Sequence, residues 1–330
     1  MRPTAHATPG DSYEDLLGLW SDLESALSML LSAPLSVQGF ELKLRQIDHW
    51  LQELLAQDTD AALYLMFQRA SFSTVGYSAS HAMVCACLCH VLAQELGLGL
   101  REHQVLALGA LTMNIGMSAL QDELALQREP LSPAQRLAVQ RHPQVSKALL
   151  MRLFITDPML LELVAEHHQP QPQDALEKLP PARQLAHILS TVDRYAALIS
   201  PRRSRPGRSA TDSLNRLAQH TRQLDQTGQA LVRAVGLYPP GTYVRLNNGD
   251  IGVVLRRGSL DMPPQVASVM DAAGHGLVPP HIHETGLQSP RIRESLAQAA
   301  IARALDPRTL AQLGVHAARA SQALWRMVEI

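Results

Sequence analysis

Aromatic residues are scarce in this chain, which limits how its core can be built. Phe, Trp and Tyr make up 4% of the 330 residues, whereas hydrophobic residues as a whole make up 46%. A hydrophobic fraction of this size is ordinary for a globular protein with a buried core. We therefore expect aliphatic side chains packed between helices, and the length allows one or two domains.

Net charge and long apolar runs are also lacking. The chain has 29 Lys and Arg against 30 Asp and Glu, a formal net charge of −1, so no overall field attracts nucleic acid or an anionic membrane. No apolar run reaches the roughly 20 residues that span a bilayer. Residues 1–11 lack the basic start and apolar stretch of a secretory leader. We therefore expect a cytoplasmic protein that binds neither DNA nor a membrane.

The chain has only three cysteines, and they lie close together. Cys85, Cys87 and Cys89 alternate within one predicted helix, a spacing that cannot form a disulfide network and fits a reducing compartment. His81, Cys85 and Cys89 are four residues apart and share one helix face. Ligands at three successive turns of a helix cannot all reach one zinc ion. Buried, inert thiols are therefore the favoured interpretation.

Histidines and one aspartate recur along four predicted helices. His167 and His168 end an apolar helical run, Asp193 lies inside the next one, and His81 and His142 lie on two earlier ones. Imidazole and carboxylate groups on neighbouring helices can converge on one divalent ion. The sequence therefore offers five candidate metal ligands.

The order and spacing of these residues resemble those of the HD-GYP family, a branch of the HD-domain metal phosphohydrolases. The resemblance extends from about residue 58 to about residue 277. It implies a mainly α fold, an HD-domain-like helical bundle with N-terminal helices and a small C-terminal β appendage followed by helices. It rests on five blocks, which are Tyr77–His81, Arg141–Pro143, His167–Gln169, Asp193–Pro206 and Gly236–Leu246.

Two parts of the family pattern are missing. The His-Asp pair is expected within residues 111–117, where this chain has Met113 and Asn114. A thioether is only a weak acceptor and an amide is neutral, so neither replaces a carboxylate that bridges two cations. The Gly-Tyr-Pro segment is absent from its place near residues 175–177, within a Pro- and Gln-rich loop over 169–181. The resemblance therefore predicts a retained scaffold with a dismantled catalytic centre, and no residue is assigned as catalytic.

Two states of the metal site stay open when this pair is missing. In the favoured state no metal or other cofactor is bound, and the remaining residues hydrogen-bond one another. In the alternative, one divalent ion (Fe, Mn or Zn) persists on His142, His167 and His168. A single ion can activate a water molecule, but it lacks the second ion that stabilises the leaving oxygen.

Arginines near the expected cleft are candidate phosphate ligands. Arg202 and Arg205 match family positions beside the cleft, and Arg128 stands where the family often has lysine. A guanidinium group donates two parallel hydrogen bonds to a phosphate. The resemblance implies cyclic di-GMP as the ligand and a diguanylate cyclase or another signalling protein as the partner, bound without hydrolysis. The alternatives are a metal-dependent cyclic di-GMP phosphodiesterase with a reduced metal site, and a helical scaffold acting through its N-terminal helices.

The extent of the resemblance and the change of periodicity after residue 235 divide the chain into four parts. Residues 1–57 are expected to form a tail and a helical hairpin, and residues 58–235 the HD-GYP-like helical domain. Residues 236–285 are expected to form a small β subdomain, and residues 286–330 C-terminal helices.

Three of these parts carry finer predictions. A single long helix is expected over residues 209–235. Strands at 242–246 and 251–256 flank an Asn-Gly turn, which is typical of a β-hairpin, and a third strand is expected over 264–270. The last helix, 320–330, offers either a homodimer contact or simple packing.

Overall fold

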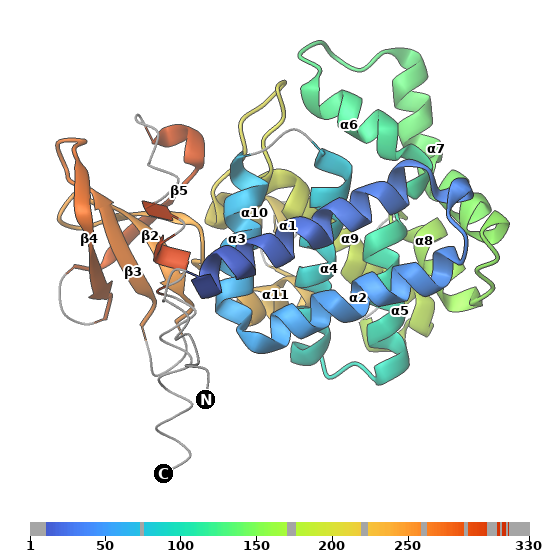
Figure 1. The fold of residues 1–330 in the computed structure, drawn as a ribbon, viewed down its shortest axis with the longest axis horizontal. Coiled ribbons are helices and arrows are strands. Elements are labelled where there is room, and N and C mark those ends of the chain that lie inside the picture. The colour runs from blue at the N-terminus through green and yellow to red at the C-terminus, as the bar shows by residue number, and fades with distance from the viewer. Residues whose placement is uncertain are drawn as a thin grey trace, which may run out of the picture.

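The computed structural model is mainly α-helical, with a small antiparallel sheet that follows the helices along the chain (Figure 1). The predicted fold class is therefore confirmed. The predictions for the N-terminal tail, for the glycine-tyrosine-proline position and for the last helix fall wholly or largely outside the described residues. Those described are 11–72, 76–169, 176–218, 224–258, 263–286, 290–301, 309–310, 312–314 and 316.

The N-terminal helices α1 (Asp11–Ser32) and α2 (Phe40–Gln57) form a hairpin joined by a short 3-10 turn (Pro34–Ser36). Figure 1 shows both helices lying across the bundle. Their apolar faces belong to the main core, as expected for helices whose apolar residues recur along one face. The hairpin therefore packs on the helical domain through buried side chains, among them Trp20, Leu23, Leu27, Leu44 and Leu51.

The central element is α4 (Tyr77–Glu95), which is buried on every side from Tyr77 to Ala93. It packs against α1 and α2, α3 (Thr59–Phe72), α5 (Leu100–Thr112), α9 (Pro181–Ile199) and other helices. A helix that is apolar all round belongs at the centre of a bundle. Any polar side chain on α4 therefore needs a partner inside the protein.

One polar group of α4 joins the hairpin to the core. The buried His90 lies between two other helices, with its Nε2 2.8 Å from Asp48 Oδ1 on α2 and its Nδ1 2.7 Å from His103 Nε2 on α5. The second Asp48 oxygen accepts a hydrogen bond from Gln52. Buried polar groups are stable when they are fully hydrogen-bonded in this way. The network fixes the position of α2 relative to α4 and α5.

Of the helices that follow α5, the one that begins at Pro133 has a capping box. Ser132 accepts a hydrogen bond from the backbone of Gln135, whose side chain returns to the backbone of Ser132, and Pro133 occupies the first helical position. This capping box marks the start of the helix, and the helix continues through Pro143. After the turn Ile115–Met117, the helices are α6 (Ser118–Leu126), α7 (Pro133–Arg152) and α8 (Pro158–Glu166).

The single helix predicted over residues 209–235 is wrong. Two helices, α10 (Ala210–Leu217) and α11 (Gln226–Val235), occupy this region. Asp225 adopts extended backbone angles and caps α11, accepting a hydrogen bond from Gly228 N at 2.8 Å. Its other oxygen lies 2.7 Å from His187 Nε2 on α9. A side chain that caps a helix marks a break in the chain, which the hydrophobic period did not show.

The sheet has five antiparallel strands in the order β4-β3-β2-β1-β5. The predicted hairpin and third strand are confirmed as β1, β2 and β3, whereas β4 was not predicted. β4 is an edge strand with Pro279 and Pro280 and few buried side chains, so it lacks the usual alternation. The strands are β1 (Tyr243–Leu246), β2 (Ile251–Arg256), β3 (Gln265–Met270), β4 (Gly276–Glu284) and β5 (Ile292–Leu296).

The prediction of C-terminal helices from residue 286 onward is wrong for the first part of that range, because β5 lies there. β5 pairs with the free edge of β1, and Arg245 forms an ion pair with Glu294 at 3.1 Å. Leu296 is the only buried side chain of this strand. The strand is therefore defined by backbone pairing with a distant segment, which leaves little pattern in the local sequence.

Ion pairs attach the sheet to the beginning of α3. Arg256 contacts Asp58 at 3.1 Å and Asp60 at 3.2 Å, and Arg257 contacts Asp60 at 2.5 Å. Gly241 has a positive φ of 81°, and a Cβ there would lie 2.4 Å from the Tyr64 carbonyl oxygen. Only glycine fits this approach. The sheet thus docks on α3, on the side of the bundle away from α8 (Figure 1).

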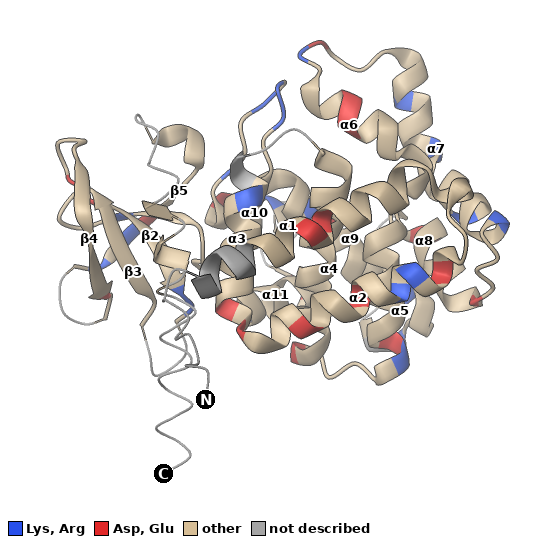
Figure 2. Ribbon diagram, viewed as in Figure 1, with Lys and Arg blue, Asp and Glu red and all other residues tan. Residues whose placement is uncertain are grey.

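Charged residues of both signs are dispersed over the ribbon, and basic residues gather in the loop between α9 and α10 (Figure 2). This loop is the arginine-rich segment that follows Ile199. Among the described residues, no helix combines the length and the hydropathy needed to cross a membrane.

Candidate metal centre

The structure brings all five predicted ligand residues together. They come from the start of α4, the middle of α7, the end of α8 and the middle of α9. Their donor atoms form two groups, and within each group the atoms lie within 4.8 Å of one another. His168 Nε2 is 3.9 Å from Asp193 Oδ2, so the two groups adjoin. We call them the three-histidine half (His142, His167 and His168) and the mixed half (His81, Cys85 and Asp193).

Backbone carbonyls fix the tautomers in the three-histidine half. His142 Nδ1 lies 2.6 Å from the Val139 carbonyl oxygen, and His167 Nδ1 lies 2.8 Å from that of Val164. A carbonyl oxygen only accepts hydrogen bonds, so both Nδ1 atoms carry the proton. Both Nε2 atoms are then lone-pair acceptors, and they face each other at 3.2 Å.

Two facing lone pairs require a positive charge between them or beside them. A shared proton is disfavoured at neutral pH, because burial lowers the pKa of His142 to about 4 and that of His167 to about 3. His168 is exposed and lies close to both rings, with its ring centroid 5.0 Å from that of His142 and 4.2 Å from that of His167. Neutral imidazoles held through Nδ1 by backbone carbonyls are the usual donors to a divalent metal. The donor set of this half therefore fits such an ion.

The mixed half is closed by its own hydrogen bond. His81 Nε2 lies 2.8 Å from Asp193 Oδ1, and Cys85 Sγ lies 3.5 Å from the same Nε2 atom. Burial alone would raise the pKa of Asp193, but the hydrogen bond and charge of His81, followed by the neighbouring imidazoles, outweigh burial and lower it. Asp193 is therefore an anion whose first oxygen is engaged by His81 and whose second faces His168.

Arg202 is connected to the mixed half through Tyr77. The Tyr77 ring stacks on His81 with centroids 5.5 Å apart and an interplanar angle of 10°. The Arg202 guanidinium lies 5.1 Å over that ring and contacts the Tyr77 hydroxyl at 3.3 Å. Arg202 is therefore separated from a candidate metal ligand by one side chain, that of Tyr77, and phosphate contact by Arg202 stays a prediction.

The other two candidate arginines are placed differently. Arg205 donates hydrogen bonds to the carbonyls of Ala197 and Ser200 at the end of α9. A cation at the C-terminus of a helix stabilises the helix, so these contacts engage Arg205 with the protein itself. Arg128 is exposed on the segment between α6 and α7. Phosphate contact by these two residues stays a prediction.

Met113 and Asn114 lie where α5 ends. Met113 is fully buried, and Asn114 is 8% exposed. The Asn114 Oδ1 atom has no hydrogen-bond partner in the described part of the chain, which is uncommon for a buried acceptor. α5 packs against α8 and α9, which carry the His pair and Asp193. The position that the resemblance gives to an acidic ligand is thus occupied by a neutral side chain.

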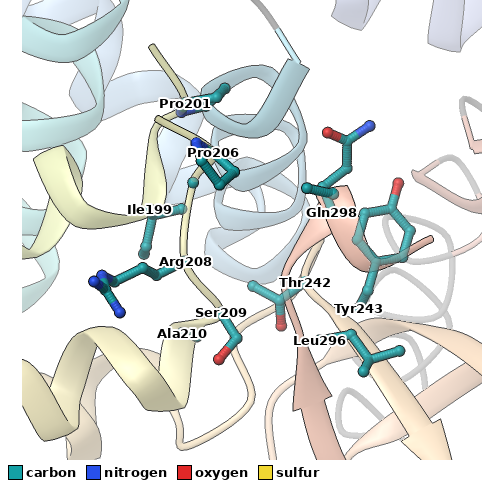
Figure 3. Close-up of a pocket in the computed structure, with 12 residues that line it drawn as sticks. Ile199, Pro201, Pro206, Arg208, Ser209, Ala210, Thr242, Tyr243, Leu296 and Gln298 are labelled. Atoms are coloured by element: carbon teal, nitrogen blue, oxygen red, sulfur yellow. The ribbon is translucent and has the colours of Figure 1, made fainter. Parts of the chain in front are cut away.

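Two hollows outside this centre are lined by other residues. A cavity of about 50 Å³ lies between the segment after α9 and the strands β1 and β5 (Figure 3). Arg208 points away from Thr242 and Tyr243 there. This volume is far below the roughly 300 Å³ of small ligand pockets. A wider hollow of about 520 Å³ lies between Leu31–Ser36 and Ile115–Leu120. None of the five predicted ligands lines either hollow.

Sequence reasoning missed two members of the centre. Cys85 was set aside because Cys89 cannot join it on one ion, yet the third donor comes from Asp193 on α9. Tyr77 was noted only as part of a motif, although it stacks on His81. A pair four residues apart on a helix was visible for His81 and Cys85. The sequence did not show that Asp193, more than a hundred positions later, completes the group.

Four histidines and an aspartate, which are candidate ligands of a divalent ion, thus lie together among the helices of the bundle. The sequence is 27% identical over 223 residues to the cyclic di-GMP phosphodiesterase PA4108 of Pseudomonas aeruginosa, a match covering 64% of this chain and 52% of that protein. The chain therefore spans about half the length of this curated relative. This homology confirms the predicted resemblance to the HD-GYP family.

Among solved structures, the chain is similar to Bd1817, an HDGYP protein from Bdellovibrio bacteriovorus. The TM-score is 0.46 and the sequence identity 16%, with coverage of 70% of this chain and 73% of the other. No family model matches the sequence.

Proposed function

We propose that this chain is a catalytically degenerate HD-GYP signalling module that binds cyclic di-GMP without hydrolysing it efficiently. One observation carries the proposal: Asn114, a buried neutral amide, stands at the position of the family's acidic ligand. The cyclic dinucleotide is proposed from the activity of the relative. A protein partner such as a diguanylate cyclase is proposed from the family resemblance.

The residues present support binding better than cleavage. A divalent ion on the three-histidine half would supply a Lewis acid for a phosphodiester oxygen. The chain supplies no bridging carboxylate from α5 for a second ion, and Asp193 is engaged by His81 at 2.8 Å. Arg202, held over Tyr77, adds a positive charge for the phosphodiester. Phosphate recognition is thus retained while stabilisation of the leaving oxygen is weakened.

The test separates binding from turnover. Purified protein loaded with Mn²⁺ or Fe²⁺ under reducing conditions is titrated with cyclic di-GMP by calorimetry. The same mixtures are incubated and resolved by ion-exchange chromatography. We expect saturable binding with the nucleotide recovered intact. Many turnovers per protein molecule, lost on adding a chelator, would show that the centre is an active phosphodiesterase.

A metal-dependent phosphodiesterase with a reduced site is the second candidate function. It is favoured by the facing Nε2 atoms of His142 and His167, because this geometry suits an ion that activates water. The two candidates differ in turnover, and the chromatographic assay decides between them. A His167→Ala variant shows whether any activity depends on this half.

A further inference from the structure

The three donor atoms of the mixed half converge in a way that the HD-GYP resemblance does not imply. His81 Nε2 lies 2.8 Å from Asp193 Oδ1 and 3.5 Å from Cys85 Sγ. A tetrahedral zinc ion with a Zn–S bond of about 2.3 Å and a Zn–N bond of about 2.0 Å holds sulfur and nitrogen about 3.5 Å apart. The spacing of Cys85 and His81 already matches this edge of a zinc site.

These residues do not form a Cys-His-Asp relay for nucleophilic catalysis. In such a relay the nucleophile and the acid contact opposite nitrogens of the imidazole. Here Cys85 and Asp193 both contact Nε2, and His81 Nδ1 has no hydrogen-bond partner among the described residues. Cys85 is fully buried, so no substrate reaches it. Donors that converge beside one ring nitrogen are arranged like ligands of a common ion.

The charges of this half balance a divalent cation. Asp193 supplies one negative charge and a Cys85 thiolate supplies a second, while His81 is a neutral donor. An uncompensated charge is costly to bury, so a neutral set of ion and ligands suits this buried place. Compared with the family's donor set, this centre lacks one negative charge because Asn114 is neutral. A Cys85 thiolate supplies one negative charge in its place.

We infer that His81, Cys85 and Asp193 form a thiolate-containing zinc site within this centre. When the ion binds, Cys85 and His81 Nε2 give up their protons to solvent, and His81 Nδ1 keeps the remaining ring proton. The ion then takes the place of the proton between Nε2 and Oδ1. A thiolate ligand favours Zn²⁺ over Mn²⁺ or Mg²⁺, so the two halves of the centre differ in metal preference.

The inference singles out one cysteine of three. Cys87 lies about 200° around the helix from Cys85, and Cys89 lies about 6 Å further along the axis. All three side chains are fully buried. Cys87 and Cys89 therefore provide matched controls for substitution of a buried thiol in the same helix.

The experiment uses Co²⁺ as a probe in the whole 330-residue chain freed of metal. A thiolate bound to Co²⁺ gives intense charge-transfer absorption in the near ultraviolet, which imidazole ligands on the three-histidine half do not give. We expect this absorption in the wild type and in the Cys87→Ser and Cys89→Ser variants, and its loss in Cys85→Ser. Zinc affinity of Cys85→Ser should fall by more than the roughly 10- to 100-fold typical of losing an outer-shell partner.

Two results would overturn the inference: no charge-transfer absorption in the wild type, or absorption that survives in Cys85→Ser. Circular dichroism of each variant establishes that it is folded, and Cys85→Ala serves as a second variant if serine at this position prevents folding. The inference goes beyond the proposed function, because the spectrum requires neither cyclic di-GMP nor turnover.

Discussion

The two halves of the metal centre differ in what holds their donor atoms in place. In the three-histidine half, His142 and His167 are each fixed by a carbonyl of their own helix, three residues earlier. In the mixed half, His81 and Asp193 hold each other. Donors fixed by the backbone point at one another whether or not a cation is present. Donors fixed by each other are already hydrogen-bonded when no cation is present. They must move apart when an ion replaces the proton that they share.

If the centre is degenerate as proposed, this difference would explain how one half keeps its donor geometry without the family's acidic ligand. The missing acidic ligand at Asn114 leaves the three-histidine half intact, because its geometry depends on Val139 and Val164. It leaves the mixed half with an anion, Asp193, that pairs with His81. The most informative changes therefore act on one half while the other serves as a reference.

Restoring the missing pair should have the largest effect. In the double variant Met113→His/Asn114→Asp, a carboxylate again joins the donor set and supplies the bridging ligand for a second ion. A preorganised charge at a reacting centre is worth roughly 100- to 1,000-fold in rate, so cyclic di-GMP hydrolysis should rise by about that factor. The product is measured by ion-exchange chromatography.

The single variant Asn114→Asp is the control for the double variant, and it should give a smaller gain. A double variant that is folded, carries two metal ions and yet shows no gain in turnover would mean that the loss lies outside this pair.

Removal of a histidine from the intact half should come next. In His167→Ala, one of the two facing Nε2 atoms is lost, and the affinity for Mn²⁺ should fall more than about 100-fold. Calorimetry and elemental mass spectrometry measure the change. His187→Ala, which removes the partner of Asp225, is the matched control. Equal Mn²⁺ binding in wild type and His167→Ala would show that this half holds no ion.

Protonation of the two halves should lower the free energy of unfolding over different pH ranges. The folded pKa of His142 is about 4, below the usual 6.5, so protonation favours the unfolded chain. For the metal-free protein, the free energy of unfolding should be unaffected by this residue above pH 6.5. It should decline between pH 6.5 and 4, by about 3 kcal/mol for His142 alone. Asp193, whose pKa is lowered, contributes stability that is lost only below about pH 4.

Urea unfolding at successive pH values checks this order, with His142→Gln as the variant in which the decline above pH 4 becomes shallower. An identical pH dependence in the two proteins would count against a neutral, buried imidazole at position 142.

The arginines should give the smallest effects. Arg202→Ala should weaken cyclic di-GMP binding by about tenfold, the effect of losing one charged hydrogen bond. Arg205→Ala should leave binding unchanged and lower the free energy of unfolding by about 0.3–1 kcal/mol, because its partners are carbonyls at the end of α9. Calorimetry and urea unfolding of both variants measure these quantities. The reverse pattern would move the phosphate site to Arg205.

Much of the helical scaffold could be predicted, because local signals such as the Ser132 cap and the His167-His168 step carry it. What could not be predicted depends on contacts between distant segments. β5 exists because β1 offers it an edge, and the helix break at Asp225 serves a contact with His187. Cys85 became a candidate ligand only when α9 placed Asp193 beside it. Such pairings leave no trace in the spacing of residues along one helix.

The burial of α4 on every side links the metal centre to the N-terminal hairpin. His81 and Cys85 lie near its start, and His90 lies two turns further on, bound to Asp48 of α2. A rigid helix cannot move at one end without moving at the other. If a partner protein displaced α2, the distances among His81, Cys85 and Asp193 would change as well. The partner would then change the affinity of the centre for metal. By thermodynamic reciprocity, bound metal would change the affinity of the hairpin for that partner by the same factor.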